Sequence, residues 1–158
     1  MQTNFNRPTM TRGEALASAG MASLGALALA LIPGVAFAKP DDVKAYLAAQ
    51  LPGTAQSGKV TIDAPEIAEN GNTVPITVSV DSPMTKDNYV KSIVVAADSN
   101  PLPGVARFDL SPANGEANVQ FRMRLAQTQN VVVVAQMSDG SLWTASKLIK
   151  VTIGGCGG

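Results

Sequence analysis

The 158-residue sequence contains no histidine and a single cysteine, Cys156. Without histidine the chain cannot build a Ser-His-Asp triad, a Cys-His pair or a His-ligated zinc site. With one cysteine it can form neither an intrachain disulfide nor a CxxC redox pair, and it cannot hold a cysteine-rich metal or iron–sulfur site by itself. These absences favour a carrier, a binding module or a structural domain over a self-sufficient enzyme.

The chain also lacks an excess of charge of either sign. Twelve Lys and Arg residues balance twelve Asp and Glu residues, which gives a formal net charge of zero. A surface that binds nucleic acid or an anionic membrane normally shows a strong basic excess, so we expect neither partner. No cofactor-binding motif is present in the sequence, and we expect no cofactor.

The N-terminal segment, residues 1–38, has the pattern of a cleaved export signal. Arg7 and Arg12 supply a positive start, residues 15–32 are rich in Ala, Gly and Leu, and the small-x-small triplet AFA precedes Lys39. We expect cleavage between Ala38 and Lys39. The alternative, a permanent membrane anchor, fits less well because the apolar stretch is short and weakly hydrophobic for a spanning helix.

The export route is less sharply defined than the signal itself. Residues 11–16 have the outline of a twin-arginine motif with one arginine missing. The twin-arginine path is therefore our first expectation and the Sec path stays open. The residue directly after the expected cleavage site is Lys39 and not a cysteine, so a lipoprotein is excluded. We expect a periplasmic, near-neutral protein of one domain, residues 39–153, with no membrane attachment after cleavage.

The pattern of the presumed mature chain predicts one helix followed by strands. Asp41–Gln50 is the one good helical window, with Pro40 and two acidic residues at its start. Apolar residues then recur with period two between turn signals. Seven strands are predicted: Lys59–Asp63, Thr73–Asp81, Tyr89–Asp98, Val105–Leu110, Glu116–Leu125, Val131–Met137 and Ser141–Ile153.

Two of these strands carry further information about the fold. In Glu116–Leu125 apolar and polar residues alternate strictly, as in a half-buried antiparallel strand. In contrast, Val131–Ala135 is a continuous apolar run, which favours a central strand or one covered on both faces. Residues 138–141 (SDGS) predict a hairpin into the last strand. We expect an all-β, seven-stranded, immunoglobulin-like antiparallel sandwich with a short N-terminal helix.

The chain ends in the sequence GGCGG, in which Cys156 is flanked by Gly154, Gly155, Gly157 and Gly158. Glycine adds no apolar surface to a core and has high conformational entropy, so we expect a flexible arm. No histidine or cationic cluster lies beside Cys156 in sequence, so we expect another protein to activate its thiol. The alternative reading is an idle thiol, or one that links two copies through a disulfide.

These features resemble the SoxY family of sulfur-carrier proteins. The resemblance rests on the C-terminal GGCGG together with four inner segments, ENGNTVPITV at 69–78, SPMT at 82–85, DNYVKSI at 87–93 and MSDGSLW at 137–143. It covers essentially the whole mature chain. A departure lies in the signal, where the family often has a full arginine pair.

The resemblance implies a function and a set of partners. Cys156 would hold sulfur intermediates covalently, and the four neighbouring glycines would form its arm. The chain would form a heterodimer with a second β-sandwich protein, SoxZ. A c-type cytochrome would couple thiosulfate to the thiol, a metal-dependent hydrolase would release sulfate, and a sulfane dehydrogenase would oxidise the remaining sulfur.

Three other function classes remain as alternatives. A ubiquitin-like carrier would use Gly158 as a thiocarboxylate, but it needs cytoplasmic activation, which the export signal argues against. A non-catalytic periplasmic immunoglobulin-like domain, for binding or structure, would leave the tail idle. An enzyme built on a carboxylate pair is the weakest reading, because the available pairs are typical of caps and turns: Asp41 with Asp42, Glu66 with Glu69, and Asp81 with Asp87.

Overall fold

The structure is a computed structural model that describes residues 36–153. The predicted signal up to residue 35 and the GGCGG tail lie outside the described residues. In chain order the elements are α2 (Pro40–Gln50), β1 (Ala55–Ser57), β2 (Val60–Asp63), β3 (Ile67–Ala68), β4 (Val74–Val80), β5 (Val90–Ala97), β6 (Gly104–Asp109), the short 3-10 helix η2 (Pro112–Asn114), β7 (Asn118–Met123), β8 (Gln129–Met137) and β9 (Leu142–Val151).

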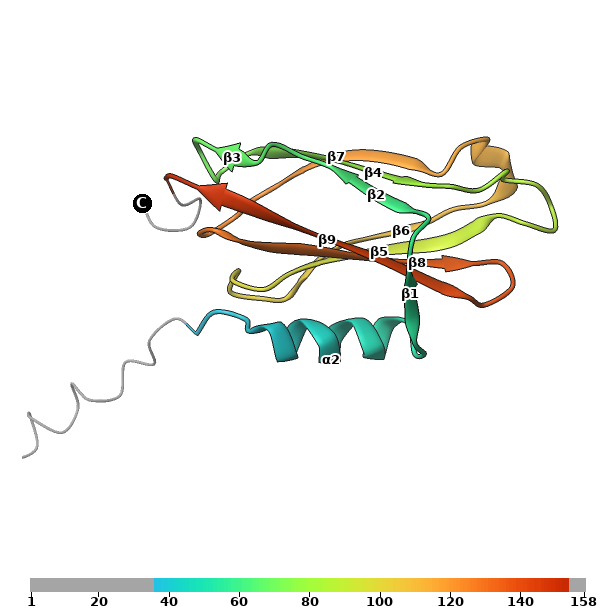
Figure 1. The fold of residues 1–158 in the computed structure, drawn as a ribbon, viewed down its shortest axis with the longest axis horizontal. Coiled ribbons are helices and arrows are strands. Elements are labelled where there is room, and N and C mark those ends of the chain that lie inside the picture. Colours follow the sequence, from blue (N-terminus) through green and yellow to red (C-terminus); the bar gives the residue numbers. More distant parts are fainter. Residues whose placement is uncertain (1–35, 154–158) are drawn as a thin grey trace, which may run out of the picture. The chain divides into compact units, whose positions relative to one another are not determined.

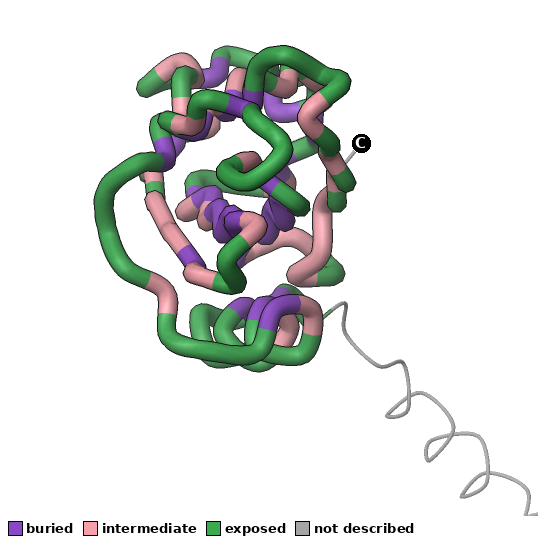
Figure 2. The backbone as a smooth tube through the Cα atoms, turned by 90° about the vertical axis from the view of Figure 1, so that its right-hand side faces the viewer, coloured by how far each residue is buried: buried purple, intermediate pink, exposed green. Residues whose placement is uncertain are grey.

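The domain has three layers, which Figure 1 shows from above to below as a small sheet, a large sheet and helix α2. The small sheet has the strand order β2-β4-β7. The large sheet has the order β1-β9-β8-β5-β6, and β3 also pairs with β9. The main core lies between the two sheets, where the buried positions gather in the end-on view of Figure 2.

Helix α2 begins one residue before the predicted start, and the prediction is otherwise confirmed. Proline suits the first turn of a helix, and acidic side chains near the helix N-terminus complement its positive end. Here the backbone amide of Lys39 donates to Asp42 Oδ2 at 2.8 Å. Val43 and Leu47 point toward the large sheet, where they pack with Leu51 against Val94, Ala96, Val134 and Leu142.

Strand β8 explains the continuous apolar run in the sequence. It pairs antiparallel with β5 on one side and with β9 on the other, so it is an interior strand. Val131, Val133 and Ala135 face the main core, whereas Val132 and Val134 face helix α2. Because both faces are covered, the usual alternation with polar residues is absent, as predicted.

Strand β7 shows the opposite pattern and lies at the edge of the small sheet. Val119, Phe121 and Met123 belong to the core cluster, and the residues between them are exposed, as predicted. Pro75, on the neighbouring β4, pairs with Arg122 of β7. On its other side β4 pairs with β2 only from Thr77 onward, so Pro75 has no partner on β2. Its missing N–H therefore removes no bond from the β2 side of the ladder.

The sequence prediction of a mostly β fold with one short helix is confirmed, but the strand count is wrong. Residues 36–153 contain nine strands, because β1 and β3 lie in segments that were expected to be loops. Both pair parallel with β9, so the prediction of a purely antiparallel sandwich is also wrong. They are three and two residues long, too short to show a period of two. The immunoglobulin-like detail stays a prediction.

The predicted hairpin between β8 and β9 is confirmed. Gly140 has a positive φ of 86°, and its amide donates to the Met137 carbonyl at 3.0 Å. Asp139 accepts from the Ser141 amide at 2.8 Å. Hydrogen bonds from the Ser141 side chain and then its backbone lower the pKa of the Asp139 carboxyl. Between residues 36 and 153, no helix has the length and apolar character needed to cross a membrane.

Candidate functional site

The end of strand β9, from which the tail continues, is hydrogen-bonded to the segment that contains β3. The amide of Lys150 donates to the Glu66 carbonyl at 2.9 Å, and the amide of Thr152 donates to the Ala68 carbonyl at 3.1 Å. The Thr152 hydroxyl donates to the Glu69 carbonyl at 2.8 Å. These bonds extend the β3–β9 pairing by a residue beyond β9 itself, which ends at Val151.

Two further contacts hold the same segment from its other sides. The amide of Gly71 donates to the Ile153 carbonyl at 2.8 Å, and the Val151 amide donates to Thr128 Oγ1 at 2.9 Å. The loop that carries Gly71 is itself closed by a bond of 2.9 Å from the Asn72 amide to Asn70 Oδ1. The chain is therefore fixed up to Ile153. We call the three residues Val151, Thr152 and Ile153 the arm base.

The predicted attachment residue lies close to the arm base along the chain. Cys156 and its four glycines lie outside the described residues, but Cys156 is only three residues beyond Ile153. A fully extended chain spans roughly 3.4 Å per residue, so Cys156 lies within about 10 Å of Ile153 in any conformation. This upper limit on the distance between Cys156 and Ile153 follows from covalent geometry alone.

The expected cleavage site lies at the start of the described domain. Lys39 is exposed and immediately precedes α2. Ala38 is buried, with 8% of its surface exposed, and its amide donates to the Asn100 carbonyl at 2.8 Å. Sequence reasoning missed this contact, which nothing in the local pattern signals. A peptidase that cuts after Ala38 must act before this segment packs or after it detaches.

The carboxylate pairs considered as catalytic candidates are at the surface. Asp41, Asp42, Glu66, Glu69, Asp81 and Asp87 are all exposed. Asp41 contacts Lys44 at 3.4 Å, and both side chains are largely in solvent. Within the described part of the chain, no three His, Cys, Asp or Glu side chains gather as metal ligands would. These carboxylates do not form a built acid–base site.

Four aromatic residues pack against the core. Phe108 and Phe121 contact each other with ring centroids 5.3 Å apart and ring planes tilted by 47°, and Tyr89 also contacts the core. Trp143 is half-buried against the core, with Lys59 Nζ 5.0 Å from its ring centroid. Its Nε1 donates to Ser141 Oγ at 3.3 Å. Arg122 and Arg124 are exposed on the polar side of the β7 region.

A surface hollow of about 350 Å³ lies next to the arm base, and sequence reasoning missed it. It is lined by Glu66, Ile67, Lys147, Leu148 and Lys150. Ile67 pairs in register with Lys150, and Leu148 is two residues earlier on β9, so Ile67 and Leu148 lie on one face of the sheet. Both are unusually exposed for large aliphatic residues, at 55% and 51%.

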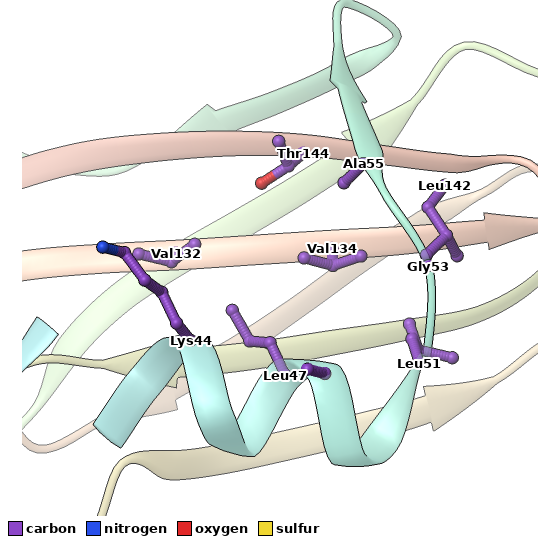
Figure 3. A pocket seen from close by; sticks show the side chains of 10 residues that line it. Lys44, Leu47, Leu51, Gly53, Ala55, Val132, Val134, Leu142 and Thr144 are labelled. Carbon is purple, nitrogen blue, oxygen red and sulfur yellow. The ribbon is translucent and has the colours of Figure 1, made fainter. Parts of the chain in front are cut away.

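A second hollow, of about 240 Å³, follows one side of helix α2 (Figure 3). Leu47 of the helix and Leu51, which directly follows it, face Val132 and Val134 of β8 across the hollow. Leu142 and Thr144 of β9 complete one wall. Its lining is mainly aliphatic, with Lys44 at the margin. We assign no chemistry to this groove, because no acid, base or nucleophile converges on it.

A comparison with protein-family models finds a match, which covers most of this domain. The family model described as "Sulfur oxidation protein SoxY" matches residues 44–156. The sulfur carrier protein SoxY from Chlorobium limicola f thiosulfatophilum has 37% sequence identity with the chain. The superposition has a TM-score of 0.60 and covers 72% of this chain and 98% of that one. Comparison with curated protein sequences finds no match.

More distant solved structures share the fold alone. A superoxide reductase (neelaredoxin) from Ignicoccus hospitalis has 21% identity and a TM-score of 0.53, covering 72% of this chain and 92% of that one. A putative superoxide reductase from Thermotoga maritima has 22% identity and a TM-score of 0.53, covering 61% of this chain and 93% of that one. At these identities the likeness carries no statement about chemistry.

Proposed function

The chain belongs to the SoxY family of sulfur oxidation proteins, and we propose that it carries sulfur intermediates covalently on the thiol of Cys156. The observation that carries this proposal is the position at which the family match ends. The match runs from residue 44 to residue 156, so its last residue is the only cysteine of the chain. A disulfide-type bond to a sulfur cargo has no other attachment point in this protein.

The arm base supports the same proposal. Hydrogen bonds that Gly71 and Thr152 donate and one that Thr128 accepts from the Val151 amide fix the chain as far as Ile153. The glycine-rich segment that follows has no side chains except that of the cysteine. A narrow channel that would exclude an ordinary peptide could therefore admit it. The β-sandwich acts as the handle, and the arm presents the thiol.

The loading step that we propose is an oxidation. The Cys156 thiol and thiosulfate together lose one proton and two electrons, and a bond forms between Cys156 Sγ and the terminal sulfur of thiosulfate. A c-type cytochrome accepts the two electrons. A hydrolase then adds water to the terminal sulfonate, which leaves as hydrogen sulfate, while a persulfide stays on Cys156. A sulfane dehydrogenase then oxidises the remaining sulfane sulfur with three waters to a sulfonate on Cys156, which releases seven protons and six electrons, and a c-type cytochrome accepts the electrons.

We further propose the setting in which this carrier works. The export signal and the expected cut between Ala38 and Lys39 support a periplasmic location, with the twin-arginine route favoured. A SoxZ-like β-sandwich subunit is the proposed stable partner, and the three enzymes dock transiently. Since a partner without its own signal must leave the cytoplasm already bound and folded, a heterodimer fits the twin-arginine route.

The experiment that tests the carrier function replaces the thiol. A Cys156→Ser variant, expressed in place of the wild-type protein, should abolish thiosulfate-dependent sulfate formation while the variant accumulates to normal levels. The conservative change keeps the arm length and removes the sulfur nucleophile. Thiosulfate oxidation at the wild-type rate by Cys156→Ser would overturn the proposal and would favour the alternative, a non-catalytic binding domain with an idle tail.

A second variant separates this carrier from a ubiquitin-like one. Deletion of Gly157 and Gly158 removes the Gly158 carboxylate that a thiocarboxylate carrier would use, and it leaves Cys156 as the last residue. We expect impaired but measurable thiosulfate oxidation from this deletion. Complete loss, together with full activity of Cys156→Ser, would point to the C-terminal carboxylate instead.

A further inference from the structure

The described domain begins to pack at the residue that directly precedes the expected cut. Ala36 and Phe37 are exposed, whereas Ala38 keeps only 8% of its surface exposed. The Ala38 amide donates at 2.8 Å to the carbonyl of Asn100, which lies in the loop between β5 and β6. Figure 1 shows this loop beside the start of α2. The segment that precedes α2 is therefore held on the folded domain.

The residue on the other side of the expected cut is held as well. The Lys39 amide donates to Asp42 Oδ2 at 2.8 Å, and the Lys39 carbonyl accepts from the Val43 amide at 3.1 Å. Pro40 follows directly, and its ring restricts the backbone at the first turn of the helix. The peptide bond between Ala38 and Lys39 therefore has a buried side chain on one side and a helix start on the other.

The Asn100 side chain connects the β5–β6 loop to the segment between β7 and β8. Its Oδ1 accepts from the Ala126 amide at 3.0 Å and from Gln129 Nε2 at 2.9 Å, and its Nδ2 donates to the Arg124 carbonyl at 2.9 Å. Gln129 is itself buried. We call these three bonds of the Asn100 side chain the Asn100 hub. The hub holds in place the residue whose carbonyl accepts from Ala38.

A peptidase needs the segment around the bond that it cuts in an extended and accessible form. In the packed state the side chain and the amide of Ala38 are both engaged with the domain, so neither is free to enter an active site. Proteolysis of a packed segment follows the population of its locally opened form. Separation of Ala38 from Asn100 is the smallest opening that frees the residue before the cut.

We propose that the folded domain controls its own processing: signal peptidase cuts between Ala38 and Lys39 only when the segment opens away from Asn100, and the Asn100 hub sets how often it opens. This inference rests on the export and the cleavage site proposed above. Hydrolysis adds one water to the peptide bond and leaves a carboxylate on Ala38 and an ammonium group on Lys39. That ammonium forms where the Lys39 amide contacts Asp42 Oδ2, so an ion pair replaces the hydrogen bond at the helix start.

The test measures two rates in the full-length precursor, folded and purified in detergent with its signal intact. One is the exchange rate of the Ala38 amide hydrogen, and the other is the rate of cutting by purified signal peptidase, with the new N-terminus identified by sequencing. Asn100→Ser removes the hub, because the shorter side chain has no amide and does not reach the same partners. We expect both rates to rise together, roughly 5- to 30-fold, as for the net loss of one or two hydrogen bonds.

Asn114→Ser is the matched control. Asn114 is also an asparagine whose Oδ1 accepts from a backbone amide, that of Ser111 at 2.8 Å, but it lies in η2 at the other end of β6. We expect both rates of this variant to match those of the wild type. Asn100→Asp is a milder second variant for the case that Asn100→Ser does not fold. It keeps Oδ1 and loses only the donor to the Arg124 carbonyl, so both rates should rise about threefold.

Several outcomes would overturn the proposal. Equal cutting rates for the wild type and the folded Asn100 variants would do so, as would faster exchange at Ala38 without faster cutting. An equal rise for Asn114→Ser would show general loosening of the domain instead of control by the hub. A mature N-terminus other than Lys39 would overturn this inference together with the expected cleavage site. The carrier function would still stand, because it is tested separately at Cys156.

Discussion

The backbone amide of Gly71 donates a hydrogen bond of 2.8 Å to the carbonyl oxygen of Ile153, the last described residue before the glycine-rich tail. The carbonyl of Gly71 in turn accepts a bond of 2.8 Å from the amide of Leu125, which follows strand β7 of the small sheet. Gly71 thus connects the end of β9 to the small sheet. The point from which the tail leaves the domain is set by both sheets.

The anchoring of the arm base can be measured by amide hydrogen exchange. Thr128→Val removes the hydroxyl oxygen that accepts from the Val151 amide at 2.9 Å. A hydrogen bond of this kind contributes about 1 kcal/mol, so exchange at Val151 should become about fivefold faster. The amide of Ile149, whose residue is fully buried within β9, is the internal control and should keep its rate. Equal acceleration at both amides would mean that the whole strand has loosened instead.

The attachment of helix α2 to the large sheet depends on a few aliphatic side chains. Leu47 is 9% exposed and packs in the helix–sheet cluster, so Leu47→Ala should lower the free energy of unfolding by about 2–4 kcal/mol. Lys44 is one turn away, and its ion pair with Asp41 is largely in solvent. Lys44→Ala should therefore change stability by less than about 0.5 kcal/mol. Urea denaturation measures both, and similar losses for the two variants would contradict this description of the helix face.

Gly58 and Gly115 differ in what a new methyl group would meet. Both have positive φ, at 136° and 75°, so alanine is strained at either position. A Cβ at Gly58 would lie 3.0 Å from Trp143 Cζ3, whereas a Cβ at Gly115 would meet nothing within 4 Å. We expect a loss of about 1 kcal/mol for Gly115→Ala and at least about 2 kcal/mol for Gly58→Ala. Fluorescence of the sole tryptophan should shift for Gly58→Ala only, and an unchanged spectrum would show that the ring is not displaced.

Much of this fold could be predicted from local patterns in the sequence. The alternation around β7 identified a half-buried strand, the apolar run of β8 identified a strand covered on both faces, and the acidic start of α2 identified its beginning. These features depend on neighbouring residues alone. Strands β1 and β3 escaped prediction because each exists only through pairing with β9, far away in sequence.

The surroundings of the candidate site were harder to predict than its cysteine. Cys156 stands out because it is the only cysteine and lies among glycines. In contrast, Leu148 has the sequence context of any strand residue, and its exposure depends on how far α2 extends over the sheet. The packing of Ala38 against Asn100 likewise requires a loop 62 residues further along the chain. Such properties arise only when distant segments meet.

The reactivity of the thiol provides a functional prediction that needs no partner. The sequence next to Cys156 contains no cation that would lower the pKa of its thiol. The alkylation rate of the reduced protein should therefore rise with pH toward a midpoint at about 8.5 or above, as for an ordinary thiol. The matched comparison is a small thiol such as N-acetylcysteine. A midpoint near neutral pH would show that the domain itself activates the cysteine.

The central claim, that Cys156 carries sulfur covalently, is tested most directly by the intact mass of the protein isolated during thiosulfate oxidation. We predict added mass corresponding to bound sulfur or sulfur–sulfonate, which disappears on thiol reduction and is absent from Cys156→Ser. Recovery of only the free thiol, or of a disulfide-linked pair of chains, from cells that are actively oxidising thiosulfate would contradict the account.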